Sequence, residues 1–245
     1  RVTETRASIC GWLADRATSE LDAPALLDGL ATRLVGAELD LHRVSIWLPT
    51  KHPELWGHQL IWEPATGARV LRRSHDVSLS KDYVGTPAEA LFMSGALTLR
   101  RRIATEPARS EFQMLAAMAD AGATDYLLVA LEPGRKYGAW ISFATRRPDG
   151  FADAQVELVT DATPWLSLYM QLHSARFETR SLLEVYLGEN AARRVVDGEF
   201  RRGTGAEIDA ALWFCDMRGF TAMSDRLPAR AVVGVLDRYF EHVAT

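Results

Sequence analysis

Apolar residues near the start of the chain recur with the period of a helix. Ile9, Leu13 and Ala17 lie four positions apart. A second run, opened by Pro24, carries leucines at similar spacing, at Leu26, Leu27, Leu30, Leu34 and Leu41. Residues three or four apart share one helical face, and proline is well tolerated in a first helical turn. The pattern therefore predicts two helices between residues 9 and about 41, which flank a sheet.

Shorter apolar runs follow, and prolines and glycines separate them. Runs of this length between such breaks predict strands. We expect strands at 43–48, 57–63, 68–73, 97–101, 125–131 and 137–145, and a helix at 109–121 that Gly122 ends. Because consecutive strands outnumber alternating strand and helix pairs, the expected fold class is α+β, an antiparallel sheet flanked by helices.

From residue 153 to about 180 the apolar positions mark one long amphipathic helix, with a predicted kink at Pro164. The residues near one face are Val156, Val159, Leu166, Tyr169, Met170, His173 and Phe177. Such a stripe fits pairing with the same helix of a second copy in a parallel dimer, and it also fits packing on the helix's own domain. Residues 182–196 add two short apolar patches, which Gly188 divides and Gly198 closes.

The composition is that of an ordinary folded protein. Of 245 residues, 48% are hydrophobic and 24% charged, and the formal net charge is −4. This charge gives no basic field for nucleic acid, and no apolar run approaches the roughly 18 residues of a membrane-spanning helix. We therefore expect a cytoplasmic protein with no nucleic-acid or membrane partner. Cys10 and Cys215 are the only cysteines, so the sequence predicts no disulfide framework, and Cys215 is expected as a buried thiol.

Candidate chemistry concentrates in residues 210–221. The continuous apolar run 210–215 predicts a strand buried on both faces, and it ends on Asp216. A helix is expected to begin at Phe220 or Thr221, with the Thr221 hydroxyl as its cap. Gly219 lets the backbone approach a ligand, and free amides at a helix start favour an anion. This corner suits magnesium and a triphosphate, although an aspartate at a strand end also serves often as a simple turn cap.

A receiver domain also carries an aspartate at the end of a strand. Its phosphoaccepting site needs an acidic pair at the end of an earlier strand. Between residues 201 and 211 the acidic residues are Glu207 and Asp209, which alternate within a single segment. The sequence therefore disfavours a receiver domain.

The stretch ALWFCDMRGFTAMSDRLP, residues 211–228, resembles the opening strand, metal loop and first helix of class III nucleotide cyclases. The resemblance implies that Asp216 binds two catalytic metal ions, Mg²⁺ or Mn²⁺. It also implies that the carbonyl of Met217 reaches one metal, and that the amides around Gly219, Phe220 and Thr221 hold the triphosphate.

Two earlier regions carry related resemblances. Residues 183–203 resemble the linker before the cyclase domain of soluble bacterial members, at Leu183, Tyr186, Leu187, Gly188, Arg194, Val195, Gly198, Arg202 and Gly203. GATDYLLVAL (122–131) and GFADAQVELV (150–159) resemble the GAF-like domain in front of certain bacterial adenylate cyclases. The resemblance implies a GAF-like sensor at 1–152, a signalling helix and transducer linker at 153–205, and an incomplete ferredoxin-like cyclase domain at 206–245.

The function implied is that of an adenylate cyclase regulated by its GAF-like domain. It would convert ATP to cyclic AMP and pyrophosphate by a two-metal mechanism, as a homodimer through the helix 153–196. In this family a second metal-binding aspartate, base-recognising residues and an Asn and Arg pair lie further along, so the chain alone is expected to be inactive. The preference for ATP over GTP is the family's. The alternative is a non-catalytic GAF-like module for effector binding and dimerisation.

The predicted sensor offers little chemistry that identifies its effector. Its tryptophans suggest an aromatic box of Trp47, Trp56, Trp62 and Trp140, although such residues more often fill a core. The run 100–102 of three arginines suggests an anion site, or a solvated strand end. His42, His52, His58 and His75 show no metal-binding spacing. The effector is therefore unknown from the sequence.

Overall fold

The computed structural model describes residues 2–17, 23–53, 55–75, 83–135, 137–199, 201, 209, 211, 212 and 214–243. The chain divides into two units, Arg1–Phe200 and Arg201–Thr245, and each is described by itself. No helix among the described residues is both long and apolar enough to cross a membrane.

The first unit is built on a six-stranded antiparallel sheet. Its strands are β1 (Arg43–Pro49), β2 (Leu55–Glu63), β3 (Gly67–Ser74), β4 (Thr98–Arg102), β5 (Asp125–Ala130) and β6 (Trp140–Thr145). Their order is β3-β2-β1-β6-β5-β4, and each neighbouring pair is antiparallel. The predicted α+β class with an antiparallel sheet is confirmed. At the centre of the sheet β1 pairs with β6, and this pair joins the strands β1 to β3 to the strands β4 to β6.

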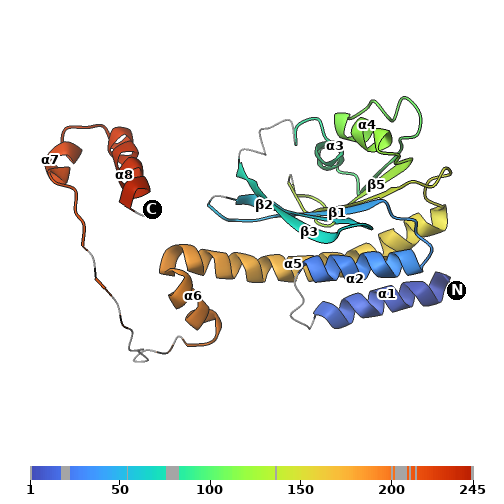
Figure 1. Ribbon diagram of the computed structural model, residues 1–245, viewed down its shortest axis with the longest axis horizontal. Coiled ribbons are helices and arrows are strands. Elements are labelled where there is room, and N and C mark those ends of the chain that lie inside the picture. Colours follow the sequence, from blue (N-terminus) through green and yellow to red (C-terminus); the bar gives the residue numbers. More distant parts are fainter. Residues whose placement is uncertain are drawn as a thin grey trace. The chain divides into compact units, whose positions relative to one another are not determined.

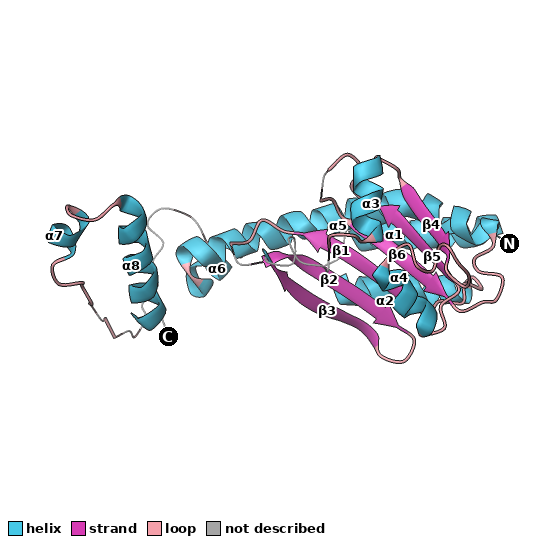
Figure 2. Ribbon diagram, turned by 90° about the horizontal axis from the view of Figure 1, so that it is seen from above, coloured by secondary structure: helices cyan, strands magenta, loops and turns pink. Residues whose placement is uncertain are grey.

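Helices cover both faces of this sheet, as Figures 1 and 2 show. The helices are α1 (Val2–Ala17), α2 (Ala23–Gly36), α3 (Pro87–Ser94), α4 (Gln113–Asp120), α5 (Asp153–Leu187) and α6 (Glu189–Val196). In Figure 1, α2 and α5 lie below the sheet and α3 and α4 lie above it. Because both faces are covered, the strands bury apolar residues on both sides, which explains their continuous apolar runs.

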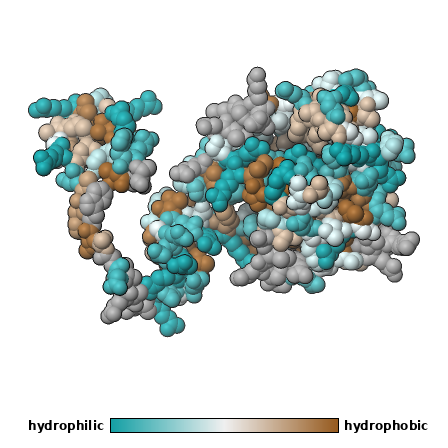
Figure 3. Space-filling view, viewed as in Figure 1, coloured by the Kyte–Doolittle hydropathy of each residue, from teal (hydrophilic) through white to brown (hydrophobic). Residues whose placement is uncertain are grey.

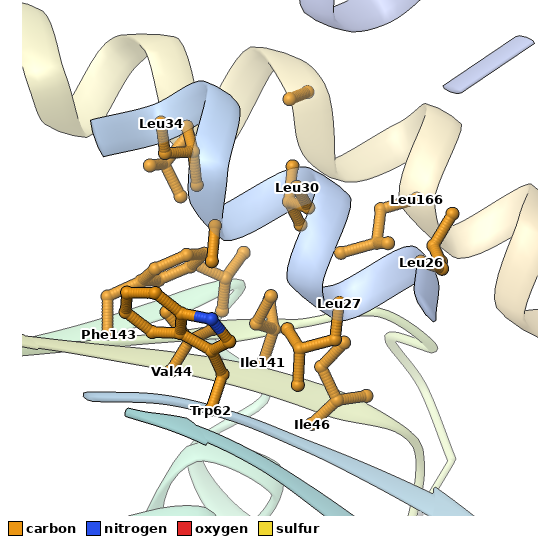
Figure 4. Packing of buried hydrophobic residues seen from close by; sticks show 14 of the residues in the cluster. Leu26, Leu27, Leu30, Leu34, Val44, Ile46, Trp62, Ile141, Phe143 and Leu166 are labelled. Carbon is orange, nitrogen blue, oxygen red and sulfur yellow. The ribbon is translucent and has the colours of Figure 1, made fainter. Parts of the chain in front are cut away.

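The core has two parts, one on each face of the sheet. Along β5, Leu127 and Val129 belong to the part below the sheet, and Tyr126 and Leu128 to the part above. Successive residues of a strand point to opposite faces, so a single strand supplies both parts. Figure 4 shows the lower part, where leucines of α2 pack on β1, β2 and β6 and meet Leu166 of α5.

The long helix is present, but the apolar stripe predicted to face a second copy packs on the helix's own domain. Val159, Leu166, Tyr169 and Met170 are buried in the lower core. The second role considered for the stripe is therefore confirmed for this part of α5. The helix continues through Pro164 and ends before Gly188, whose φ is +80°. The predicted break at Gly188 is thus confirmed, and α6 follows it.

One helix was missing from the predictions. The stretch around Leu91 forms α3, which Thr86 caps by accepting a hydrogen bond from the amide of Glu89 at 3.3 Å. Pro87 occupies the first turn and Gly95 ends the helix at φ +69°. The helix predicted at 109–121 is shorter than expected and spans only α4.

The second unit contains two helices, α7 (Phe220–Ser224) and α8 (Ala229–Val243). The strand predicted at 210–215 is wrong for the residues that the structure describes, since Ala211, Leu212, Phe214 and Cys215 lie outside any strand. Leu212 is 83% exposed and Phe214 is 89% exposed. A strand needs backbone partners, and the described part of this unit supplies none. Ala210 and Trp213 lie outside the described residues.

Candidate functional site

The residues predicted to bind metal and triphosphate lie in an exposed turn of the second unit. Asp216 Oδ1 accepts a hydrogen bond from the amide of Met217 at 2.9 Å, so the carboxylate caps its own turn. The carbonyl of Met217 accepts the amide of Phe220 at 3.3 Å. Gly219, at φ +74°, is the N-cap of α7, and no side chain caps this helix, so the predicted Thr221 cap is wrong.

This turn does not make a metal site by itself. Magnesium takes about six oxygen ligands, and Asp216 is one carboxylate in an open turn. Within the ranges that the structure describes, no three His, Cys, Asp or Glu side chains lie close enough to hold an ion. Cys215, expected as a buried thiol, is exposed, and its Sγ accepts a hydrogen bond from the Tyr239 hydroxyl at 2.9 Å. The roles of Asp216, Met217, Gly219, Phe220 and Thr221 toward metal and nucleotide stay predictions.

A more developed candidate site lies in the first unit, on the α3 and α4 face of the sheet. A cavity of about 80 Å³ there is walled by the aromatic rings of Trp47, Trp56, Tyr83, Tyr126 and Trp140. We call it the aromatic cavity. Trp47 and Trp140 are directly opposite each other on β1 and β6. Three of the four tryptophans of the predicted box are thus brought together.

The fourth tryptophan, Trp62, lies on the other face of the sheet. It belongs to the lower core with Val44, its partner on β1. The register of β2 shifts between Leu55 and Gly57, which places Trp56 and Trp62 on opposite faces although they are six positions apart. A bulge of this kind has no clear signal in the sequence, so the box was predicted with one wrong member.

The rings around the aromatic cavity contact one another in edge-to-face and tilted pairs. The centroids of Trp47 and Trp56 lie 4.6 Å apart, those of Trp56 and Tyr83 5.1 Å apart, and those of Tyr83 and Tyr137 5.4 Å apart. Such arrangements are favourable for aromatic quadrupoles. Burial raises the pKa of Tyr83 to about 12 and also raises the pKa of Tyr126, so both phenols are neutral near pH 7.

The close contact of Trp47 with β2 depends on Gly57. A Cβ at this position would lie 2.5 Å from the Trp47 ring and 2.5 Å from the carbonyl oxygen of Leu48. Any side chain here would displace the indole from the wall of the cavity. Gly57 is therefore required for the shape of the aromatic cavity.

One cation is held at the wall of the aromatic cavity by a chain of hydrogen bonds. Arg73 Nη2 donates to Gln59 Oε1 at 2.9 Å, and Gln59 Nε2 donates to Ser45 Oγ at 3.1 Å. Ser45 Oγ in turn donates to the carbonyl of Leu60 at 3.2 Å. The described lining of the cavity includes no histidine, cysteine or carboxylate. This arrangement suits binding of a planar anion.

The predicted arginine run does not form an anion site, because its first two members contact carboxylates. Arg100 Nε and Nη2 donate to Asp125 Oδ2 at 3.0 and 2.7 Å, and Asp125 is fully buried. This hydrogen bond raises the pKa of Arg100. Arg101 pairs with Glu111. The anion site considered from the sequence is therefore wrong for these two residues. Arg102, the last residue of β4, is exposed, which agrees with the solvated strand end that was also considered.

Sequence reasoning missed Gln59, Arg73 and Tyr83 as cavity residues. Gln59 and Trp47 are opposite each other on β2 and β1, so strand pairing would place them on one face. Arg73 is opposite Gly57 at the shifted register of β2 and β3. Tyr83 precedes the missed helix α3, and without that helix nothing in the sequence places its ring.

No protein-family model matches the chain, and no curated protein matches it. Among solved structures, the chain is similar to the A. aeolicus nlh2 GAF domain in an inactive state, with 10% identity, a TM-score of 0.46, and coverage of 70% of this chain and 99% of that chain. It is also similar to the GAF domain of an Acinetobacter phosphoenolpyruvate-protein phosphotransferase, with 14% identity, a TM-score of 0.48, and coverage of 71% and 94%.

A third similar structure is the GAF domain of a two-component sensor histidine kinase from Bacillus halodurans, with 9% identity, a TM-score of 0.42, and coverage of 62% and 97%. None of the three bears on the predicted cyclase fragment. The identities are 14% or lower and the TM-scores are below 0.5, so no fold family, ligand or activity follows from these similarities.

Proposed function

We propose that the first unit is a GAF-like sensor, which binds a small aromatic acid in the aromatic cavity. The observation that carries this proposal is the combination of aromatic rings in edge-to-face and tilted contact with one fixed cation, Arg73, and the described lining residues include no carboxylate. Indole and phenol faces accept a flat ring, and a guanidinium binds a carboxylate.

The size of the aromatic cavity limits the ligand. Pockets for drug-sized molecules have volumes of about 300 Å³ or more, whereas this cavity has about 80 Å³. It therefore suits a single aromatic ring with one acidic group rather than a nucleotide. The neutral phenol of Tyr83, which lines the same cavity, can donate a hydrogen bond to this group.

The experiment is a titration of the chain with benzoate, followed by tryptophan fluorescence. Trp47 and Trp56 contact each other at the cavity, so a bound ring should change their emission. We expect saturable binding, and about tenfold weaker binding for Arg73→Gln, because a charged hydrogen bond is lost. Cyclohexanecarboxylate has the same charge without the flat ring, and it should bind much more weakly.

Equal binding of benzoate and cyclohexanecarboxylate would show that the rings do not recognise the ligand. Unchanged binding by Arg73→Gln would show that the cation does not recognise it. Either result contradicts the proposal. Arg72→Gln is the matched control, because Arg72 is the next residue on β3 and lines the other face of the sheet.

We further propose that this sensor regulates a class III nucleotide cyclase whose metal site begins at Asp216. The support is the DMRGFT sequence and the exposed position of the Asp216 carboxylate, which leaves it accessible to ligands from elsewhere. The competing candidate is a binding and dimerisation module without catalysis. The absence of further metal ligands around Asp216 within the described residues favours that module for the chain as it stands.

Dimerisation, in this proposal, uses a face of α5 different from the one predicted. A series of residues at alternating spacings of three and four is exposed along the helix: Trp165, Leu168, Leu172, Ala175, Thr179, Leu182 and Tyr186. We call it the heptad seam. Two parallel helices pair through a seam of this spacing. Figure 3 shows apolar surface among hydrophilic residues where the C-terminal part of α5 lies. The occupant we propose is the same seam of a second copy.

A further inference from the structure

A larger cavity lies on the opposite face of the sheet from the aromatic cavity. Its volume is about 400 Å³, within the usual range of about 300 to 1,000 Å³ for small-molecule pockets. It is bounded by β1, β2 and β3, by the start of α2, and by α5. In Figure 1 the two helices, α2 and α5, both run below the sheet.

The walls of this cavity are mainly aliphatic. They include Pro24, Leu48, Leu60 and Val70, and the only aromatic carbon ring among the described lining residues is that of Phe177. We call it the aliphatic cavity. Aliphatic walls gain from burying a flexible hydrocarbon chain, and they offer no pair of faces between which a flat ring could stack.

The charge at the aliphatic cavity favours an anion. Arg72 lines it and is exposed, and among the described residues no carboxylate lies within ion-pair distance of its guanidinium. Neighbouring Arg69, by contrast, pairs with Glu63 at 2.8 Å, and Arg73 is held by Gln59. No aspartate or glutamate belongs to the described lining.

His58 adds hydrogen-bonding capacity to the aliphatic cavity rather than a fixed second charge. His58 stacks edge-on against Phe177, with centroids 4.6 Å apart. Burial lowers the pKa of His58, and the nearby Arg72 and His173 lower it further, so this ring is neutral near pH 7. Arg72 is left as the permanent charge, which matches a ligand with a single negative charge.

An unpaired hydroxyl also lines the aliphatic cavity. The Thr50 side chain lines the aliphatic cavity, and its buried Oγ1 has no hydrogen-bond partner among the described residues. Buried polar groups are usually paired, because leaving one unpaired is costly. A carboxylate oxygen in the cavity would supply the missing acceptor.

We infer that the aliphatic cavity is a second binding site, which takes an aliphatic monocarboxylate with its chain along Leu48, Leu60 and Val70 and its carboxylate at Arg72. This goes beyond the proposed function, because it requires neither the aromatic cavity nor the cyclase. Arg72 and Arg73 are adjacent on β3 and serve opposite faces of the sheet, so the two sites can be tested independently.

The ligand would contact the long helix directly. His173, Ser174 and Phe177 of α5 line the aliphatic cavity, and Leu172 and Ala175 of the heptad seam lie on the same turns. A ligand bound in the aliphatic cavity would therefore affect the position of α5, the helix that is proposed to pair with a second copy. The aromatic cavity has no lining residue on α5 among the described residues.

The test is calorimetric titration of the chain with decanoate below its micelle concentration. The comparison ligands are 1-decanol, which lacks the charge, and butyrate, which lacks the chain. Two substitutions at exposed positions probe the site without disturbing the core. Arg72→Gln removes the cation, and Val70→Trp fills the cavity from β3, where Val70 is 41% exposed. Arg73→Gln is the matched control.

We expect one decanoate per chain, about tenfold weaker binding for Arg72→Gln, no detectable binding for Val70→Trp, and unchanged binding for Arg73→Gln. Decanol and butyrate should both bind much more weakly than decanoate. The inference would be overturned by an equal loss of decanoate affinity in Arg72→Gln and Arg73→Gln. It would also be overturned by undiminished binding of decanoate to Val70→Trp, or by binding of decanol as tight as that of decanoate. Failure of benzoate to bind at the aromatic cavity leaves this result unaffected, so the two proposals fail separately.

Discussion

His58 is a residue whose protonation the fold opposes. It is packed against Phe177, and Arg72 on β3, His173 on α5 and His52 in the loop before β2 all add positive charge around it. Its pKa is lowered from the ordinary value, so the folded state takes up this proton less readily than the unfolded state does. The free energy of unfolding is therefore not reduced by His58 above about pH 6.5. It falls as the pH drops from there toward the lowered pKa of this group.

We predict that the free energy of unfolding decreases between about pH 7 and pH 5, and that His58→Gln makes this decrease smaller. Urea denaturation at several pH values measures both effects. The decrease should not vanish, because burial also lowers the pKa of His42. His75→Gln, at an exposed histidine, is the control. An identical pH dependence in the parent and in His58→Gln would rule out this role of His58.

The arginine run shows why some residue roles cannot be predicted from the sequence. Arg100 lies on β4. Its partner Asp125 lies on β5, directly opposite Arg102 of β4. The amide of Phe151, just before α5, also donates to Asp125 Oδ2 at 3.0 Å. The sequence gives the three arginines and the apolar strands, but the carboxylate that neutralises Arg100 comes from another strand. Such a pair depends on register, which no local pattern specifies.

At the scale of elements, periodicity predicted most of the first unit. The strands and the long helix follow from apolar spacing, because buried faces impose a period of about two or 3.6 residues. What periodicity did not provide was the choice between two apolar faces of α5. The face with Tyr169 and Met170 is the more continuous one in the sequence and packs on the domain, whereas the heptad seam is interrupted by Ala175 and Thr179.

The heptad seam leads to a prediction about assembly. Leu168→Glu combined with Leu182→Glu should convert a dimer into a monomer, because pairing would bury unpaired carboxylates. Light scattering over a range of protein concentrations measures the mass. Leu187→Glu, also on α5 and exposed but outside the seam, is the matched control and should leave the dimer intact. A parent chain that is monomeric at high concentration would contradict the proposed pairing.

The second unit is the element that sequence patterns described least well. Its apolar run predicted a buried strand, but the pattern reports only that these residues favour burial, and burial requires a surface to pack against. The exposed Leu212 and Phe214 have no such surface among the described residues of this unit. The predicted metal loop comes directly after this run, and its geometry was predicted from the strand. Because the strand is wrong, the geometry of Asp216 was not predictable from the sequence either.

At the scale of the whole molecule, the proposed cyclase function predicts a separation between binding and catalysis. The chain of 245 residues should form no cyclic nucleotide from ATP or GTP, because Asp216 supplies one of the several ligands that two metal ions need. In a protein extended by a complete catalytic domain, Asp216→Ala should abolish product formation and leave the melting temperature nearly unchanged. Asp225→Ala, in the turn after α7, is the control. Turnover by the short chain, or full activity of Asp216→Ala, would refute the assignment.

The pairing of β1 with β6 also determines when the first unit can fold. Arg43 is opposite Ala144, and Trp47 is opposite Trp140, so the middle of the sheet joins an early segment to a late one. Contacts this distant in sequence form slowly, because a long loop must close first. During synthesis, the leucines of α2 leave the ribosome well before β6 and α5 exist to cover them. The nascent chain therefore passes through a period in which the apolar face of α2 is exposed and can bind chaperones or aggregate.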